Sequence, residues 1–113
     1  MLASTRLIKG RLNKAMPADS LQWALHGVKI NGVAHGCSGF VRNKENGVVV
    51  YINTDMIIMQ GNKTILIRYA KDFTDYTGCR NMYTNEDKFV DDIKQMLLNL
   101  DAYMRELSAC HKI

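Results

Sequence analysis

The strongest constraint on the fold is a stripe of apolar side chains near the C-terminus, which recur at the spacing of one helix face. They are Phe89, Val90, Ile93, Met96, Leu97, Leu100, Met104 and Leu107. Thr84 precedes the stripe as a candidate N-cap, and Glu86 and Asp87 follow it where the helix dipole favours negative charge. The pattern predicts one long amphipathic helix from Thr84 to about Ser108, which must cover a partner surface.

Upstream of this helix the chain reads as β-strands separated by turns. Two Asn-Gly pairs, Asn31-Gly32 and Asn46-Gly47, supply residues that tolerate positive φ, as tight hairpin turns require. Residues 48–52 give the strongest strand signal, and residues 64–69 alternate again. Residues 56–59 fit either a short strand or a buried connection, and residues 71–83 read as a loop.

Together these patterns predict an α+β fold. We expect an antiparallel β-meander of three to five strands, from about Trp23 to Ala70, packed against one long C-terminal amphipathic helix. Within the second strand, the run from Gly36 to Gly39 indicates a bulge or a close approach of two backbones. Because no repeat or long linker appears, residues 21–113 should form a single domain.

Residues 1–20 are predicted to be a basic N-terminal arm. They carry the cations Arg6, Lys9, Arg11 and Lys14 before the single proline, Pro17. Their apolar side chains make no clean stripe, so a short helix and an extended arm fit equally well. Three roles suit such an arm: a solubilising tail, a segment that docks on the chain's own sheet, or a partner-binding element.

The net charge of +4 is unevenly distributed, because residues 1–71 hold ten Lys/Arg against three Asp/Glu, and residues 72–113 hold five against eight. Such polarity can steer an anionic partner or pair two copies head to tail. No apolar run is long enough to span a membrane, and cations interrupt every window that would suit a secretory signal. We therefore expect a cytoplasmic protein in which Cys37, Cys79 and Cys110 remain reduced thiols.

No catalytic, metal or cofactor motif is complete in the sequence. His35 and Cys37 suggest a base and a nucleophile, but the surrounding spacing does not match a nucleophile elbow and no helix pattern follows. Structural zinc sites use ligands in close pairs at both ends, whereas Cys79 stands alone, apart from the adjacent Cys110 and His111. Glycine-rich phosphate loops are also missing. We predict no catalytic residue, no metal and no cofactor.

The segment from Arg68 to Tyr83 is the strongest candidate for an interaction site, because it mixes cations with aromatic residues. Its candidate partner-binding residues are Arg68, Tyr69, Lys71, Tyr76, Arg80 and Tyr83. The segment fits a structured loop that caps the core edge, a protein contact, or a nucleic-acid contact. The nucleic-acid alternative combines Tyr69, Tyr76 and Arg80 with the cations of the arm, which are Arg6, Lys9, Arg11 and Lys14.

Residues 48–81, which overlap this segment, resemble uncharacterised short accessory proteins of phages, plasmids and conjugative elements in Gram-positive bacteria. The resemblance implies a small cytosolic protein of a mobile element that modulates a host or element macromolecule, and it transfers no functional residue. We therefore predict a small non-enzymatic interaction protein that modulates or inhibits a protein partner, with nucleic-acid binding as the alternative. The unpaired edges of a meander also favour a homodimer.

Overall fold

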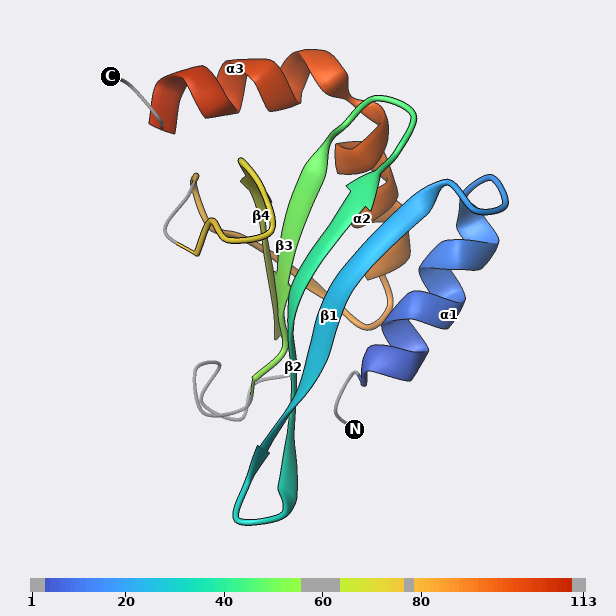
Figure 1. Cartoon of the computed structure of the whole chain (residues 1–113), viewed down its shortest axis with the longest axis vertical. Coiled ribbons are helices and arrows are strands. Elements are labelled where there is room, and N and C mark those ends of the chain that lie inside the picture. The colour runs from blue at the N-terminus through green and yellow to red at the C-terminus, as the bar shows by residue number, and fades with distance from the viewer. Residues whose placement is uncertain (1–3, 56–63, 77–78, 111–113) are drawn as a thin grey trace.

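The computed structural model describes residues 4–55, 64–76 and 79–110, and it confirms the predicted α+β class. The described elements (Figure 1) are, in chain order, α1 (Thr5–Ala15), β1 (Leu21–Ile30), β2 (Val33–Asn43), β3 (Val49–Asn53), β4 (Thr64–Ala70), β5 (Met82–Asn85), α2 (Phe89–Leu98) and α3 (Leu100–Cys110). The strands form one sheet in chain order, and each neighbouring pair is antiparallel. The predicted meander is therefore confirmed.

Both Asn-Gly pairs turn the chain, but in different ways. Asn31 and Gly32 have φ values of 51° and 80° and form the tight turn between β1 and β2. In the connection from β2 to β3, Gly47 has a φ of 81° and its N–H donates to the carbonyl oxygen of Asn43 at 2.7 Å, so this turn is longer. Residues 56–59, predicted as a short strand or a connection, lie outside the described residues.

Gly36 and Gly39 mark close approaches of backbones, as the sequence predicts. A Cβ on Gly39 would lie 1.9 Å from the carbonyl oxygen of Ala24 in β1. A Cβ on Gly36 would lie 2.2 Å from the carbonyl oxygen of Thr54, which follows β3. These glycines let β2 pass close to both of its neighbours.

The basic arm contains a docked helix. Ser4 caps α1 because its hydroxyl accepts the backbone N–H of Leu7 at 3.2 Å. Ile8 and Leu12 are fully buried in the core beneath the helices. Figure 1 shows α1 beside β1 and α2, which it contacts. Of the three roles considered for the arm, docking on the chain's own domain is the one observed.

The C-terminal helix begins later than predicted, and Thr84 is not its N-cap. Thr84 belongs to β5, which pairs with β4 in a segment predicted as a loop. This pairing stabilises the strand, and the short local sequence alone does not predict it. Helix α2 starts at Phe89, after a turn in which Oδ1 of Asn85 accepts the N–H groups of Asp87 and Lys88 at 3.0 Å each.

Thr84 instead stabilises the junction between β5 and α2. Its buried hydroxyl donates to Oδ2 of Asp92 at 2.6 Å. Thr84→Val keeps the shape and removes the donor, so we expect the free energy of unfolding to fall by about 1.5–3 kcal/mol in chemical denaturation. The matched control is Thr74→Val, in which the exposed Thr74 loses an equally short bond, 2.6 Å, to Asp72. It should change stability much less, and equal effects would contradict burial as the cause.

The predicted single helix is also broken, because Asn99 separates α2 from α3. The side-chain amides of Asn43 and Asn46 both donate to the carbonyl oxygen of Leu97, at 3.0 and 2.9 Å, in place of the next helical turn. Asn99 then caps α3 by accepting the N–H of Ala102 at 3.0 Å. The prediction of one continuous helix is wrong for this reason.

The break rotates α3 out of the predicted stripe. Leu100 and Met104, expected to be buried, are 41% and 56% exposed. Tyr103 faces the sheet instead, and its hydroxyl donates to the carbonyl oxygen of Ala70 at 2.8 Å. The core therefore receives the stripe of α2 and, from α3, the ring of Tyr103 together with the partly buried Ala102 and Leu107.

The two faces of the sheet carry separate apolar clusters. The larger cluster lies between the sheet and the helices. The smaller one consists of Phe40, Val49, Tyr51, Leu66 and Ala70, with Ala24 and Phe73 packed against it. We call the side that carries the smaller cluster the open face, because none of the described helices contributes to it (Figure 1).

Candidate interaction surface

The connection after β4 packs aromatic side chains onto the open face, and we call residues 71–76 the aromatic loop. Phe73 stacks on Phe40 with ring centroids 5.8 Å apart. Tyr76 meets Phe40 and Tyr51 edge-on at 5.2 and 5.9 Å, which is a favourable arrangement for aromatic rings. Because Tyr76 remains 61% exposed, it presents one side to the sheet and the other to solvent.

Two aspartates give the aromatic loop its shape. The backbone N–H and the hydroxyl of Thr74 both donate to Oδ1 of Asp72, at 2.8 and 2.6 Å. The N–H of Lys71 donates to Oδ2 of Asp75 at 2.9 Å. The bonds from Thr74 lower the pKa of Asp72. Such side-chain turns explain why the segment shows neither a helical nor a strand period.

Arg68 joins the aromatic loop to the sheet and is only 9% exposed. Its guanidinium lies 4.2 Å from the ring centroid of Tyr51. It donates to the carbonyl oxygen of Tyr76 and, at 3.2 Å, to Oδ1 of Asn81. Within the described part of the chain, no carboxylate lies within ion-pair distance of it. Arg68 is therefore a buried anchor of the loop, not an exposed contact residue.

Two further side chains extend this surface. The guanidinium of Arg42 lies 4.8 Å from the ring centroid of Phe73 and donates to Oε1 of Gln22 at 3.2 Å. Tyr83 of β5 pairs with Leu66, so it points to the same face, where it is 61% exposed. The open face thus combines exposed tyrosines with a half-buried arginine.

The strand residues Phe40, Arg42 and Tyr51 of this surface are not among the predicted site residues. Tyr51 pairs with Phe40 on one side and with Arg68 on the other, so the three share a face. Strand alternation would have grouped Phe40 with Arg42, which lies two residues away. The sequence does not tell which of the two faces the helices cover, and this is why the group was not found.

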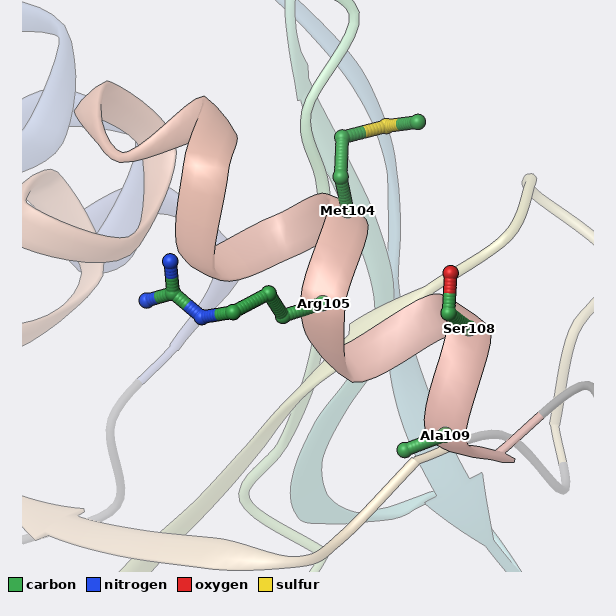
Figure 2. Close-up of a pocket in the computed structure, with 4 residues that line it drawn as sticks. All are labelled: Met104, Arg105, Ser108 and Ala109. Atoms are coloured by element: carbon green, nitrogen blue, oxygen red, sulfur yellow. The ribbon is translucent and has the colours of Figure 1, made fainter.

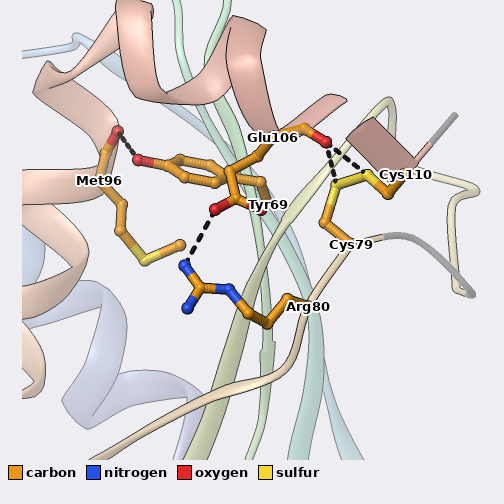
Figure 3. Close-up of polar contacts among 6 residues, drawn as sticks. All are labelled: Tyr69, Cys79, Arg80, Met96, Glu106 and Cys110. Carbon is orange, nitrogen blue, oxygen red and sulfur yellow. Dashed lines mark hydrogen bonds and ion pairs between the residues drawn. A yellow bond between two sulfur atoms is a disulfide. The ribbon is translucent and has the colours of Figure 1, made fainter. Parts of the chain in front are cut away.

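The predicted partner-binding residues do not form one continuous surface. Tyr69 faces the helices, where its hydroxyl donates to a backbone carbonyl of α2 at 3.4 Å and burial raises its pKa (Figure 3). Arg80 forms an ion pair with Glu106 of α3 at 2.9 Å (Figure 3). Lys71 is exposed in the aromatic loop. The aromatic members left on the open face are Tyr76 and Tyr83.

The cations proposed for nucleic-acid binding lie on the other side of the sheet from the aromatic loop. Helix α1 packs into the larger cluster, and the aromatic loop packs onto the open face (Figure 1). Lys9 and Arg11 already lie over aromatic rings of β1 and α2, at 6.0 and 4.9 Å from the centroids. Arg6 and Lys14 are exposed. The basic helix and the aromatic loop therefore do not form a single nucleic-acid surface.

Cys79 and Cys110 form a disulfide that joins the chain after the aromatic loop to the end of α3 (Figure 3). Their Cα atoms are 5.2 Å apart, within the usual range for a disulfide. The prediction of reduced thiols is wrong for this pair, because folding brings together residues that are 31 positions apart.

The third cysteine, Cys37, lies in the core beside Thr54, and its Sγ is 3.4 Å from Oγ1 of that residue. Burial raises the pKa of the Cys37 thiol, and the hydrogen bond from Thr54 only partly opposes this. Because the thiolate is the reactive form, a buried thiol with a raised pKa is a poor nucleophile. The site around His35 and Cys37 therefore gives no support to covalent catalysis.

The outward side of α3 is a shallow surface and not a deep pocket. Met104, Arg105, Ser108 and Ala109 line it (Figure 2). All four come from the same helix, so no second element encloses a ligand there. In the part of the chain that the structure describes, no three potential metal ligands gather at one place. His111 lies outside that part.

The described helices are too short or too polar to cross a membrane. No protein-family model, curated protein or solved structure matches this chain. Its function therefore has to be inferred from the geometry of its own surface.

Proposed function

We propose that this chain is a small, non-enzymatic interaction protein that binds a protein partner on its open face. The observation that carries the proposal is the state of Tyr76. Its ring is 61% exposed, yet Phe40 and Tyr51 contact it and Arg68 holds its backbone carbonyl. An exposed aromatic side chain that is already fixed in position loses little conformational entropy on binding, which is typical of interface hot spots.

The composition of the surface supports a protein partner over a nucleic acid. Tyrosine and arginine are enriched at protein interfaces, and the open face presents Tyr76, Tyr83 and the half-buried Arg42. Asp72 and Asp75 lie in the same loop and weaken the positive field that a phosphate backbone needs. The resemblance to accessory proteins of mobile elements agrees with a modulator of this kind.

Tyr76→Ala should weaken partner capture about tenfold or more, because a hot-spot aromatic side chain is removed while the loop backbone keeps its bond to Arg68. Immobilised wild-type and variant chains would be incubated with lysate of the organism that carries the gene, and bound proteins quantified by mass spectrometry. The matched control is Leu98→Ala, since Leu98 is 55% exposed but belongs to α2. It should leave capture unchanged, and equal losses in both variants would contradict the proposed surface.

The nucleic-acid alternative is tested through α1. Reversing the charges of Arg6 and Lys14, both exposed, should leave the captured protein and its amount unchanged. It should also leave retention on a DNA column unchanged at every salt concentration. Salt-dependent retention that decreases on charge reversal would count against the proposal and favour nucleic-acid binding.

A further inference from the structure

The end of α3 packs weakly against the rest of the chain. Tyr103 is its buried side chain, Leu107 is half-buried against the main core, and the other residues from 104 to 110 are exposed or half-buried. Two contacts link this end to the chain after the aromatic loop: the Cys79–Cys110 disulfide and the Arg80–Glu106 ion pair. Arg80 is 69% exposed, and exposed ion pairs contribute little to stability. The disulfide is therefore the stronger of the two links.

The other end of this disulfide belongs to a segment that positions the aromatic loop. Arg68 binds the carbonyl oxygen of Tyr76 and the side chain of Asn81, so Cys79 lies between two residues held by the same guanidinium. A bond from Cys79 to Cys110 adds α3 to this arrangement. Breaking the bond frees the segment on one side while Arg68 still holds it on the other.

The surroundings also suit the reduced form of the pair. The sulfurs of Cys79 and Cys110 lie 3.6 and 2.8 Å from the carbonyl oxygen of Glu106 (Figure 3). Each thiol of a reduced pair therefore has an acceptor for its proton. Cys110 is exposed, so small thiols and disulfides can reach it. Cys79 is 7% exposed and belongs to the main core cluster, in which Phe89 and Ile93 of α2 are fully buried.

We propose that Cys79 and Cys110 form a reversible redox tether that controls the partner-binding surface, an inference that rests on the proposed function. The oxidised tether holds the end of α3 against residues 79–81 and keeps the aromatic loop in its binding arrangement. Reduction releases the end of α3 and loosens residues 79–81. Partner binding is therefore tighter in the oxidised form, because a fixed surface loses less entropy on binding.

The co-reactant is a low-molecular-weight disulfide, for which glutathione disulfide is the probe. The thiolate of the exposed Cys110 attacks one of its sulfurs, the small S–S bond breaks, and one glutathione leaves as a thiol. The thiolate of Cys79 then attacks the Cys110 sulfur of the mixed disulfide and releases the second glutathione. The protein loses two electrons and two protons, and glutathione disulfide gains them to become two glutathione thiols. Excess thiol reverses both steps.

The tether itself is tested without a partner. Wild-type chain would be equilibrated in mixtures of reduced and oxidised glutathione, alkylated after denaturation, and weighed. With three cysteines in the chain and two in the tether, the oxidised form should take one alkyl group and the reduced form three. Amide hydrogen exchange in α3 should become about tenfold faster on reduction, whereas exchange in β2 and β3 stays constant. Three alkyl groups at every ratio, or unchanged exchange in α3, would overturn the proposal.

Two variants separate the disulfide from its neighbouring ion pair. Cys110→Ser should show the fast exchange of the reduced form at every glutathione ratio. Arg80→Gln removes the ion pair with Glu106 and keeps both cysteines, so its oxidised form should exchange like the wild type. Fast exchange in oxidised Arg80→Gln would contradict a tether that depends on the disulfide.

Partner capture distinguishes this inference from the function on which it rests. Oxidised and reduced wild-type chains would serve as bait, with Tyr76→Ala in both states. Reduction should weaken the Tyr76-dependent capture at least fivefold, which corresponds to about 1 kcal/mol. Equal Tyr76-dependent capture in both states would overturn the regulatory tether and leave the proposed function standing. Capture that never depends on Tyr76, together with the expected exchange result, would overturn the proposed function and confine the tether to a structural role.

Discussion

Replacing Gly39 with alanine should lower the free energy of unfolding by about 4 kcal/mol or more, a large share of the stability of a domain of this size. The new Cβ would lie 1.9 Å from the carbonyl oxygen of Ala24 and 2.7 Å from the Cα of Leu25. Both atoms belong to the backbone of β1, so no side-chain rotation relieves the overlap. The φ of +149° at Gly39 adds strain for any residue with a side chain.

Chemical denaturation of Gly39→Ala measures this effect, and Gly27→Ala is the matched control. Gly27 lies in the same strand pair, but a Cβ there meets nothing within 4 Å. The control should change stability by less than about 1 kcal/mol. If Gly39→Ala were as stable as Gly27→Ala, the close approach of β1 and β2 at Gly39 would be incorrect.

The parts of the fold that could be predicted from the sequence are those fixed by local chemistry. The β-branched run at residues 48–52, the alternation in residues 64–69 and the Asn-Gly turns depend on neighbouring residues, so they predicted strands in the region of β1 to β4. Strand β5 has four residues and depends on its pairing with β4. The break at Asn99 likewise depends on Asn43 and Asn46, which contact Leu97 from more than fifty positions away. Contacts of this range leave no periodic signal.

Only part of the candidate surface could be predicted from the sequence. The mixture of tyrosines and cations between residues 68 and 83 singled out the region that contains Tyr76, whose side chain is 61% exposed. Alternation in β4 would have shown that Arg68 and Tyr69 cannot share a face, because adjacent strand residues point to opposite sides. Tertiary packing alone places α1 and the aromatic loop on opposite sides of the sheet. It also brings Cys79 and Cys110 together.

The rotation of α3 gives the second large prediction. Ile93→Ala should lower the free energy of unfolding by about 2–5 kcal/mol, because Ile93 is fully buried and its truncation leaves a cavity. Met104→Ala should change it by less than about 0.5 kcal/mol, since Met104 is 56% exposed. Chemical denaturation of the two variants compares an inward and an outward member of the same sequence stripe.

The comparison distinguishes a broken helix from a continuous one, because a continuous helix would make the two losses of unfolding free energy similar. In such a helix Ile93 and Met104 are eleven residues apart, or about three turns, and face the same side. The break at Asn99 removes that equivalence. A large loss of unfolding free energy for Met104→Ala would therefore indicate that Met104 is buried, and it would contradict the two-helix structure. A small loss of stability for Met104→Ala, beside a large one for Ile93→Ala, would agree with the exposed position of Met104 and the buried position of Ile93.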